Sequence, residues 1–538
     1  MKSHSSVLRD FTVDRRVWLL SAVAIVIGAG AAVLAVVLLK AIAVATNIFY
    51  YHRLSLAPVT PAGSPLGHWM PLVPIVGGLI VGLMARFGSD KIRGHGIPEA
   101  IEAILLNGAK VQPSIAILKP ISAAISIGSG GPFGAEGPII MTGGAFGSLV
   151  AQWMHLTDAE RTTLLVAGAS AGMSATFAAP LASILLAVEL LLFEWRPRSL
   201  IPVAFASITA EIVRIVWLGS RPLFAMPSLP TQQTAPIAIA ALVLGLLVGI
   251  AAAGLSKMMY GFEDLFERLP VHWMWWPAIG GIGIGVGGMF FPRGLGVGYD
   301  NIAQLLRGNA PLGLLVGLVV AKSLMWAFSL GSGTSGGVLA PLLMIGGALG
   351  ELAARATHAS APEQALWAAV GMGAMLSGSL GVPLTAILFC LEITHCLPAL
   401  LPVMLGCVSA YAMTSLIMPR SILTEKLSRR GYHLTREYGT DPLETVSLVE
   451  VMAELGSQDC ADLDPEAELP EVYAFADETS RAAVEKMAIS GLTTLLVVDR
   501  AAGTVCGTVS LQDLLLGRRK LAKREQERER IFTPGRSA

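Results

Sequence analysis

Three short segments join glycine to proline inside otherwise apolar sequence: GHGIP at Gly94–Pro98, GAEGP at Gly134–Pro138 and GVLAP at Gly337–Pro341. Because proline is favoured in the first turn of a helix, each segment predicts a helix that begins within the apolar region. Such a start presents unpaired backbone N–H groups and the positive end of the helix dipole, and together these bind anions. The segments contain no lysine or arginine. We therefore predict weak, reversible binding of a small anion, with no formally charged cation beside it.

The elements that must position these segments are membrane-spanning helices. The chain has 538 residues, of which 54% are hydrophobic and 14% charged, whereas soluble proteins average about 25% charged residues. Long apolar runs such as Val17–Lys40, Ile237–Leu255 and Leu312–Leu330 approach the roughly 20 residues that a spanning helix needs. After Arg420 the composition becomes that of an ordinary soluble protein. The sequence predicts a membrane region followed by a smaller soluble domain.

The membrane region contains an internal repeat. KPISAAISIGSGGPFGAEGPIIMTGGAFG, from Lys119, matches KSLMWAFSLGSGTSGGVLAPLLMIGGALG, from Lys322, without a gap and at an offset of 322 − 119 = 203. Upstream, GHGIPEAIEAILL from Gly94 resembles GVGYDNIAQLL from Gly296. Two-fold repeats in the membrane are typical of secondary transporters and related channels, whose ion sites lie between the halves. The sequence leaves open whether the repeats are parallel or inverted.

Glu136 interrupts this match, because its partner in the repeat is Leu339. Acidic residues inside a membrane are functional candidates by default. A carboxylate among groups that attract anions can take the anion's place, and after protonation it would lose that attraction and move away. We interpret Glu136 as a gate that also binds a proton.

Three other interpretations are less consistent with these patterns. Glycines that only allow close helix packing would explain single Gly-xxx-Gly pairs, but not proline-started runs in register in both halves. GASAG at Gly168–Gly172 matches the serine-hydrolase motif, but it lies in an apolar helical run and its partner in the repeat, GMGAM, lacks the serine. We therefore do not expect an enzyme. A divalent-cation channel would need carboxylates or carbonyl oxygens at its pore.

Charge and cysteine content narrow the class further. The net charge of zero gives no reason to expect nucleic-acid binding. The five cysteines include no CxxC pair and predict neither disulfides nor a zinc site. Basic residues flank the first and last spans, among them Arg15, Arg16, Arg420 and Lys426. Segments of membrane proteins that lie in the cytoplasm carry an excess of Lys and Arg. We therefore expect a multi-pass protein of the cell (inner) membrane with both termini in the cytoplasm.

The three segments resemble the filter motifs of the CLC family of chloride channels and proton/chloride exchangers, and the resemblance covers nearly the whole chain. It implies an all-α polytopic membrane protein with an inverted repeat and broken helices, assembled as a homodimer with one pore per subunit. The expected cargo is chloride or a related small anion, with no cofactor or metal. The resemblance implies that Glu136 is the external gating glutamate. The implied filter residues are Gly94, His95, Gly96, Ile97, Pro98, Gly134, Ala135, Gly137, Pro138, Gly337, Val338, Leu339, Ala340 and Pro341, with Leu423 at the inner end.

The sequence departs from the family pattern within this filter. His95 replaces the filter serine, Ala135 the arginine before the gating glutamate, and Leu339 the filter phenylalanine. Leu423 replaces the tyrosine that closes the inner end. These changes are expected to loosen the inner constriction. A histidine gains charge near pH 6–7, so one hypothesis is that acid raises anion affinity through His95. The alternative is a neutral histidine that fills the serine's place.

A further departure concerns the mechanism. The internal proton-transfer glutamate of the family's exchangers aligns with Leu190, beside Glu189. This favours passive, channel-type conductance. The alternative is a proton-coupled exchanger in which Glu194, one helical turn beyond Leu190, is a substitute proton acceptor. Glu194 is equally consistent with an interfacial acid paired with Arg196 or Arg198.

The predicted organisation has five parts: a cytoplasmic segment at 1–16, membrane repeats at 17–220 and 236–420, an α/β domain at 440–520 and a charged tail at 521–538. The soluble domain resembles one CBS module, with a helix at Thr479–Ser490, a strand at Leu495–Asp499 and a Ser510-x-x-Asp513 ending. Only one good copy fits, which argues against nucleotide binding. Ser510 then serves as a helix cap.

Overall fold

The structure is a computed structural model that describes residues 15–229, 235–429, 431, 443, 447–454, 472–500 and 502–516. The described residues form two compact units, one up to residue 431 and one from residue 443 onward. Most of the predicted N-terminal segment, the charged tail at 521–538 and the acidic part of the predicted soluble domain lie outside the described residues.

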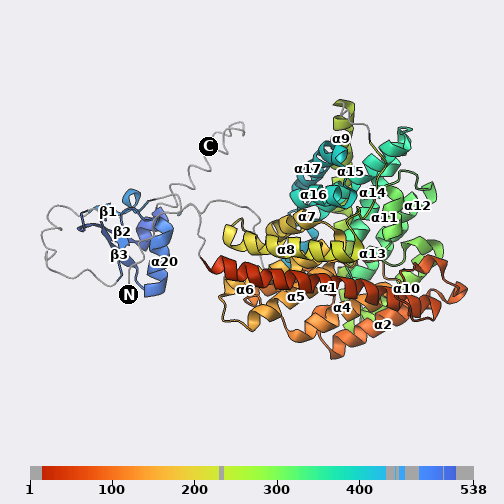
Figure 1. The fold of residues 1–538 in the computed structure, drawn as a ribbon, viewed down its shortest axis with the longest axis horizontal. Coiled ribbons are helices and arrows are strands. Elements are labelled where there is room, and N and C mark those ends of the chain that lie inside the picture. The colour runs from red at the N-terminus through yellow and green to blue at the C-terminus, as the bar shows by residue number, and fades with distance from the viewer. Residues whose placement is uncertain are drawn as a thin grey trace. The chain divides into compact units, whose positions relative to one another are not determined.

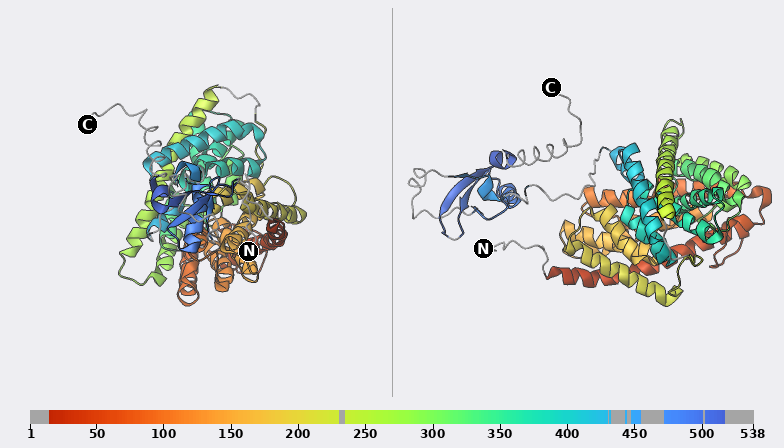
Figure 2. Two further views of the ribbon diagram at one scale, coloured as in Figure 1. Left: turned by 90° about the vertical axis from the view of Figure 1, so that its left-hand side faces the viewer. Right: turned by 90° about the horizontal axis from the view of Figure 1, so that it is seen from above.

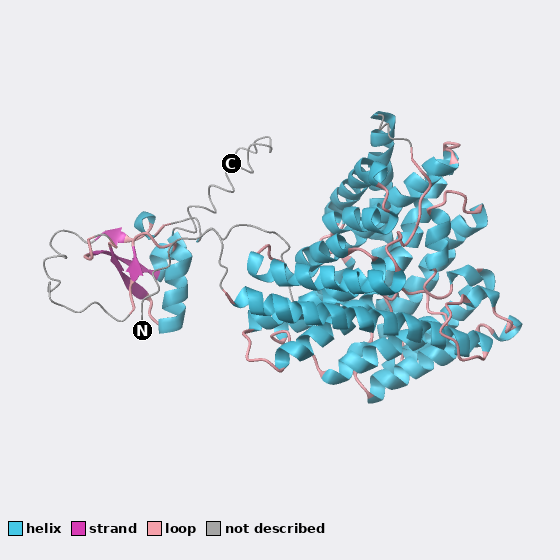
Figure 3. Cartoon of the chain, in the orientation of Figure 1, coloured by secondary structure: helices cyan, strands magenta, loops and turns pink. Residues whose placement is uncertain are grey.

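The membrane unit is built from helices, and strands are drawn only in the small unit (Figures 1 and 3). The first half contains α1 (Arg16–Tyr51), α2 (Leu72–Phe87), α3 (Ile97–Leu106), α4 (Pro113–Gly128), α5 (Glu136–Gln152), α6 (Asp158–Phe177), α7 (Pro180–Leu186, continued by a π-helical turn to Leu192) and α8 (Pro197–Leu218). The second half contains α9 (Ala235–Glu267), α10 (Trp276–Phe290), α11 (Tyr299–Leu305), α12 (Leu312–Gly317, joined by a π-helical turn to α13, Ser323–Gly331), α14 (Leu339–Ala356), α15 (Ala361–Leu380), α16 (Pro383–Thr394), α17 (Leu400–Ile417) and α18 (Ile422–Arg429).

Helices of the two halves begin at equivalent positions. Glu136 begins α5 and Leu339 begins α14, and 339 − 136 = 203. The same separation relates the starts of α6 and α15 (361 − 158), α7 and α16 (383 − 180), and α8 and α17 (400 − 197). The predicted sequence repeat is therefore confirmed as a repeat of helices.

Equivalent residues of the two halves meet while running in opposite directions. Gly134 and Gly337 form an antiparallel bridge, in which Gly134 donates to Gly337 at 3.2 Å and Gly337 donates to Gly134 at 2.8 Å. This reciprocal contact places a two-fold axis between the two glycines. An antiparallel contact between equivalent residues fits the inverted repeat that the family resemblance implies.

Helix lengths within this unit are mixed. Seven helices among the described residues are long and apolar enough to cross a membrane, including α1, α8 and α9. The long helices α1 and α8 pack side by side (Figures 1 and 2). Others are too short: α16 has 12 residues, or about 18 Å against a hydrocarbon core of roughly 30 Å. The unit therefore combines spanning helices with helices that end partway, as predicted for broken helices.

Glycine lets equivalent helix pairs approach closely. A side-chain carbon added at Gly143 of α5 would lie 2.3 Å from the carbonyl oxygen of Gly168 of α6, and the pair Gly346 and Gly371 repeats this contact at 2.3 Å in α14 and α15. Ser170, the serine of the hydrolase-like motif, shares a hydrogen bond of 2.8 Å with Ser207. Close helix packing thus accounts for this motif.

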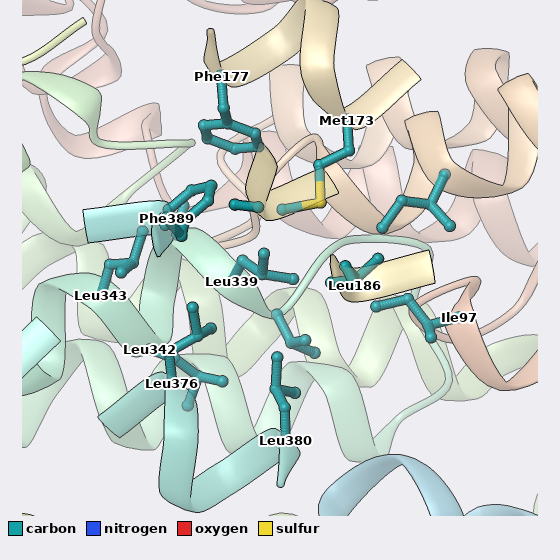
Figure 4. Packing of buried hydrophobic residues seen from close by; sticks show 14 of the residues in the cluster. Ile97, Met173, Phe177, Leu186, Leu339, Leu342, Leu343, Leu376, Leu380 and Phe389 are labelled. Carbon is teal, nitrogen blue, oxygen red and sulfur yellow. The ribbon is translucent and has the colours of Figure 1, made fainter. Parts of the chain in front are cut away.

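An apolar cluster connects the two halves. The rings of Phe177 in α6 and Phe389 in α16 pack edge to face, with their centroids 5.1 Å apart. Ile97 and Leu339, which begin α3 and α14, belong to the same buried cluster (Figure 4). Two of the predicted filter segments therefore deliver side chains into this core, so filter and core are packed together.

The small unit is an α/β domain, as predicted. Its sheet has the order β1-β4-β3-β2, with β1 (Ala453–Glu454), β2 (Ala474–Phe475), β3 (Thr494–Val498) and β4 (Val505–Ser510), and α20 (Ser480–Ser490) packs beside it. The β2–β3 pair is parallel and the other two pairs are antiparallel. Ser510 donates to Asp513 at 2.6 Å, and the Asp513 N–H donates back at 3.3 Å. These are the contacts of a helix cap.

Candidate functional site

Each of the three glycine-proline segments begins a helix inside the membrane unit. The helices α3, α5 and α14 start at Ile97, Glu136 and Leu339, and each carries its segment's proline in the first turn. Every residue of the segments 94–98, 134–138 and 337–341 is buried. The predicted helix starts are therefore confirmed, and they lie within protein rather than at its surface.

The three segments meet at Gly137. A side-chain carbon added at Gly137 would lie 1.8 Å from the carbonyl oxygen of His95 and 3.4 Å from the Cα of Gly337. The N–H of Gly336 donates to the carbonyl of Gly94 at 3.4 Å. One glycine thus contacts both other segments, and the starts of the three helices surround a common centre.

Glu136 lies at this centre with none of its surface exposed. Its Oε2 lies close to two glycines. A side-chain carbon added at Gly134 would lie 1.6 Å from this oxygen, and one added at Gly337 would lie 2.7 Å from it. The backbone N–H of Ala340, in the first turn of α14, also acts on this carboxylate. The carboxylate therefore occupies space between the starts of α5 and α14, where oriented N–H groups favour negative charge.

Two buried lysines lie beside glycine-containing loops, one in each half. Lys119 donates to the carbonyl oxygens of Ile92 and Gly94, both at 2.8 Å, and Lys322, its partner in the repeat, makes the equivalent two bonds at 3.0 Å. Both side chains are fully buried. The prediction that no formally charged cation lies near the filter is therefore wrong. Both lysines lie in helices outside the motifs, and only the fold brings their ammonium groups to the filter loops.

Glu99 caps α3, the helix that begins in the first glycine-proline segment. Its Oε2 accepts the N–H of Gly96 at 2.9 Å, and its Oε1 accepts Nζ of Lys426 at 2.8 Å. The Lys426 nitrogen would lie 2.6 Å from a carbon added at Gly94. The expectation that the start of α3 presents only unpaired N–H groups is therefore wrong for Gly96. Sequence reasoning missed this ion pair because its members are 327 positions apart.

His95 lines a cavity of about 810 Å³ whose walls also include Gly94, Glu99 and Lys426. Its side chain is 2% exposed, and neither ring nitrogen has a hydrogen-bond partner among the described residues. The charged groups that act on the ring are Glu99, Lys426 and Lys119. Because a buried polar group without a partner is costly, a ligand that formed a hydrogen bond with either nitrogen would stabilise this site.

Leu423 is fully buried in α18. It is absent from the walls of the cavity that His95 lines. The hydroxyl of Tyr260, in α9, donates to the carbonyl oxygen of the preceding residue, Ile422. A tyrosine of α9 therefore anchors the helix that carries Leu423.

The acidic side chains near the expected internal proton site accept hydrogen bonds from backbone N–H groups at helix starts. Glu189 accepts the N–H groups of Leu384 and Thr385 at 3.2 and 2.9 Å, at the start of α16. Its repeat partner Glu392 accepts two N–H groups at the start of α7, at 2.9 and 2.8 Å. Carboxylates stabilise helix N-termini through the dipole. Leu190 is fully buried, so this region has a reciprocal pair of caps in place of a free internal acid.

Glu194 has the contacts of the interfacial alternative. Its Oε1 accepts the hydroxyl of Ser199 at 2.6 Å. Its Oε2 lies 3.4 Å from Arg196 and 3.8 Å from Arg198, and the side chain is 28% exposed. These are the contacts of an acid paired with Arg196 and Arg198.

Helices that break at buried glycines, in an inverted repeat with an acid at the centre, define a membrane ion-transport protein with its site between the halves. A match to the family described as "Voltage gated chloride channel" extends over residues 77–415, which include all three filter segments. The chain belongs to this family, the CLC proteins, as its motifs indicated.

Some similar proteins are named chloride channels and others are named proton/chloride exchangers. The chain is 31% identical over 366 residues to a protein of Ralstonia nicotianae named "Putative chloride channel protein ClcB-like". The matched region covers 66% of this chain and 85% of the relative. It is 31% identical over 363 residues to a Citrobacter koseri protein named "H(+)/Cl(-) exchange transporter ClcA", which covers 64% of this chain and 75% of the relative. It is 30% identical to "Chloride channel protein CLC-f" of Arabidopsis thaliana over 46% of that longer relative.

Solved structures share the fold. The chain matches a slow cyanobacterial Cl-/H+ antiporter with a TM-score of 0.68 and 24% identity, over 78% of this chain and 99% of the other. It matches a eukaryotic CLC transporter with a TM-score of 0.64 and 16% identity, over 92% of this chain and 98% of the other. At these identities the likeness establishes the architecture alone.

Proposed function

We propose that this protein exchanges chloride or a related small anion for protons across the cell membrane, with Glu136 as the group that both ions use. The observation that carries the proposal is the buried carboxylate of Glu136 between the starts of α5 and α14. An ionised carboxylate and an anion repel each other there and compete for the same N–H groups. Protonation removes the charge and admits the anion. Binding of a proton and binding of an anion are therefore linked.

The names of the relatives favour exchange over passive conductance. Leu190 favoured a channel in the sequence, because it replaces the internal acid of exchangers. Several relatives are nevertheless named H(+)/Cl(-) exchange transporters, and exchange becomes the proposal. A channel gated by Glu136 is the second candidate, supported by the absence of a carboxylate at Leu190.

The remaining roles are proposed from the family resemblance. We assign the buried segments at 94–98, 134–138 and 337–341 to the anion filter and Leu423 to its inner end. We expect a homodimer with one pore per subunit, no cofactor, and both termini in the cytoplasm. The mass of the purified complex in detergent checks the dimer, and a mass equal to one chain would contradict it.

Reconstitution into liposomes tests exchange directly. Purified protein is placed in vesicles under an outward chloride gradient, and chloride efflux and internal pH are recorded together. We expect chloride efflux to drive proton uptake against a proton gradient. Chloride efflux with no proton movement would establish the channel candidate, and the absence of any halide flux would exclude both.

His95→Ala is expected to leave the acid response of transport unchanged. The ring is 2% exposed, and two lysines, Lys119 and Lys426, act on it; burial and nearby cations both favour the neutral imidazole. Anion affinity at pH 6 and at pH 8 should therefore change by the same factor. Affinity is measured from flux against chloride concentration at both values of pH. His68→Ala, in an exposed turn, is the control. A weakened acid response in His95→Ala alone would instead support a His95 that gains charge.

Glu194→Gln tests the substitute proton acceptor. Because Glu194 is held by Ser199, Arg196 and Arg198, we expect this variant to keep the wild-type ratio of protons to chloride within about twofold, as for a surface ion pair of small energetic weight. The ratio is measured from the reversal potential in liposomes. A variant that passes chloride but no longer moves protons would instead identify Glu194 as the internal acceptor.

A further inference from the structure

A fourth glycine-rich loop, outside the three filter motifs, also reaches the centre of the membrane unit. It spans Gly296–Gly298 and is the counterpart of Gly94–Gly96 in the other half. All four of these terminal glycines have positive φ, 68° and 79° in the second half and 77° and 89° in the first. The loop is followed by Tyr299, the first residue of α11, whose counterpart is Ile97 (299 − 97 = 202). The two halves thus place a phenol and an aliphatic side chain at equivalent positions.

The ring of Tyr299 is held by aromatic neighbours. It packs edge-on against Phe177 with centroids 6.2 Å apart and against Phe224 with centroids 6.1 Å apart. Phe177 in turn packs against Phe389 in the apolar core (Figure 4). Edge-to-face aromatic pairs have a preferred geometry, so these contacts fix where the hydroxyl of Tyr299 points.

That hydroxyl points at the gate. It donates to Oε1 of Glu136 at 3.5 Å, and it is the one side-chain hydrogen-bond donor to this carboxylate recorded among the described residues. The other oxygen, Oε2, lies against Gly134 and Gly337 and has no hydrogen-bond partner there. The phenol therefore contacts only one of the two carboxylate oxygens, and the contact is long in this closed arrangement.

We propose that Tyr299 is a positioning residue of the gate, whose hydroxyl holds the ionised Glu136 carboxylate in the anion's place and releases it on protonation. This inference rests on the proposed role of Glu136. A hydrogen bond to a charged acceptor is stronger than one to a neutral acceptor. Tyr299 therefore stabilises the closed, ionised state more than the released, protonated state. Its hydroxyl sets the acidity at which the gate leaves the filter.

Tyr299→Phe removes the hydroxyl and keeps the ring. Without the donor, the ionised closed state is less favoured, so protonation and release occur at higher pH. We expect the midpoint of the curve of chloride flux against pH to move upward by about 0.5 to 1 unit, less than for a short hydrogen bond to a charged group, because this contact is long. Flux is measured in liposomes with the same pH on both sides. Tyr51→Phe, which removes a hydroxyl that donates to Thr60 in a loop, is the matched control and should show no shift.

The double variant Tyr299→Phe with Glu136→Gln separates this inference from the gate itself. If Tyr299 acts through the carboxylate, its substitution has no further effect once Glu136 is an amide. A wild-type midpoint in Tyr299→Phe would overturn the inference while leaving Glu136 as the gate. A difference in chloride flux between Glu136→Gln and the double variant at any pH would show that Tyr299 acts elsewhere and would overturn it as well. An unchanged pH response in Glu136→Gln alone would remove the gate and the inference together.

Discussion

Glu136→Gln is expected to abolish proton movement and to leave chloride flux nearly independent of pH. The amide has almost the shape of the carboxyl but carries no charge and binds no proton. A positioned proton-transfer group contributes about a hundredfold or more to its reaction, so proton flux should fall at least that far. Chloride flux should persist, because the neutral side chain no longer competes with the anion for the N–H groups near Ala340. Chloride efflux and internal pH, recorded from the same liposomes, give both quantities.

The matched control for this variant is Glu194→Gln, which makes the same change at a carboxylate paired with arginines. It should retain both fluxes. If Glu136→Gln kept its proton coupling and pH response, the carboxylate would not be the shared group, and the proposed mechanism would fail. If chloride flux also disappeared in folded Glu136→Gln, the side chain would be needed for conduction and could not act as a removable gate.

Gly137→Ala is expected to abolish transport. The added carbon would lie 1.8 Å from the backbone carbonyl of His95, far inside contact distance, and a backbone atom cannot turn aside as a side chain can. The start of α5 must therefore move away from the segment at 94–98, which separates the N–H groups that bind the anion. We expect chloride flux to fall by more than about tenfold, since displacement of a binding group by an ångström can cost about 10²-fold. Flux is measured at equal amounts of reconstituted protein.

Two further glycine variants separate a filter defect from a folding defect. Gly254→Ala in α9 adds a carbon with nothing within 4 Å, so it should fold and transport normally. Gly134→Ala meets the flexible carboxylate of Glu136 instead of backbone, so it should displace the gate and raise flux at neutral pH. Size-exclusion profiles in detergent report folding for all three. Normal transport in Gly137→Ala would contradict the convergence of the three segments.

Hydropathy located the helices but not their ends. The run Ile237–Leu255 lies within α9, which continues to Glu267, 267 − 255 = 12 residues further. The run Leu312–Leu330 is nearly the whole of α12 and α13, joined through a π-helical turn. Apolar composition marks the part of a helix that faces lipid or core, whereas the backbone ladder continues through polar residues until a cap or a turn interrupts it. Helix bounds therefore depend on local hydrogen bonding that composition does not contain.

The candidate site was predictable where its residues are close in sequence. Proline and glycine impose their conformations locally, so the starts of α3, α5 and α14 followed from the motifs alone. The cap of Gly96 by Glu99 is also local, three residues apart, and the spacing was a signal that could have been used. Tyr299 was aligned with Ile97 by the repeat, and a hydroxyl at that position was a second signal. Neither spacing nor repeat revealed that the phenol meets Glu136, 163 residues away.

By itself, the sequence determined the membrane class, the duplication, the three helix starts at glycine and proline, and Glu136 as the acid that breaks the repeat. Each of these depends on composition, register or backbone preference, which are properties of neighbouring residues. Only the tertiary structure decided that equivalent glycines of the two halves meet in an antiparallel bridge, that Lys119 and Lys322 place ammonium groups beside the filter loops, and that Lys426 pairs with Glu99. These depend on which distant segments share a buried space. The low dielectric of the protein interior makes the resulting contacts strong there, and no pattern along the chain records them.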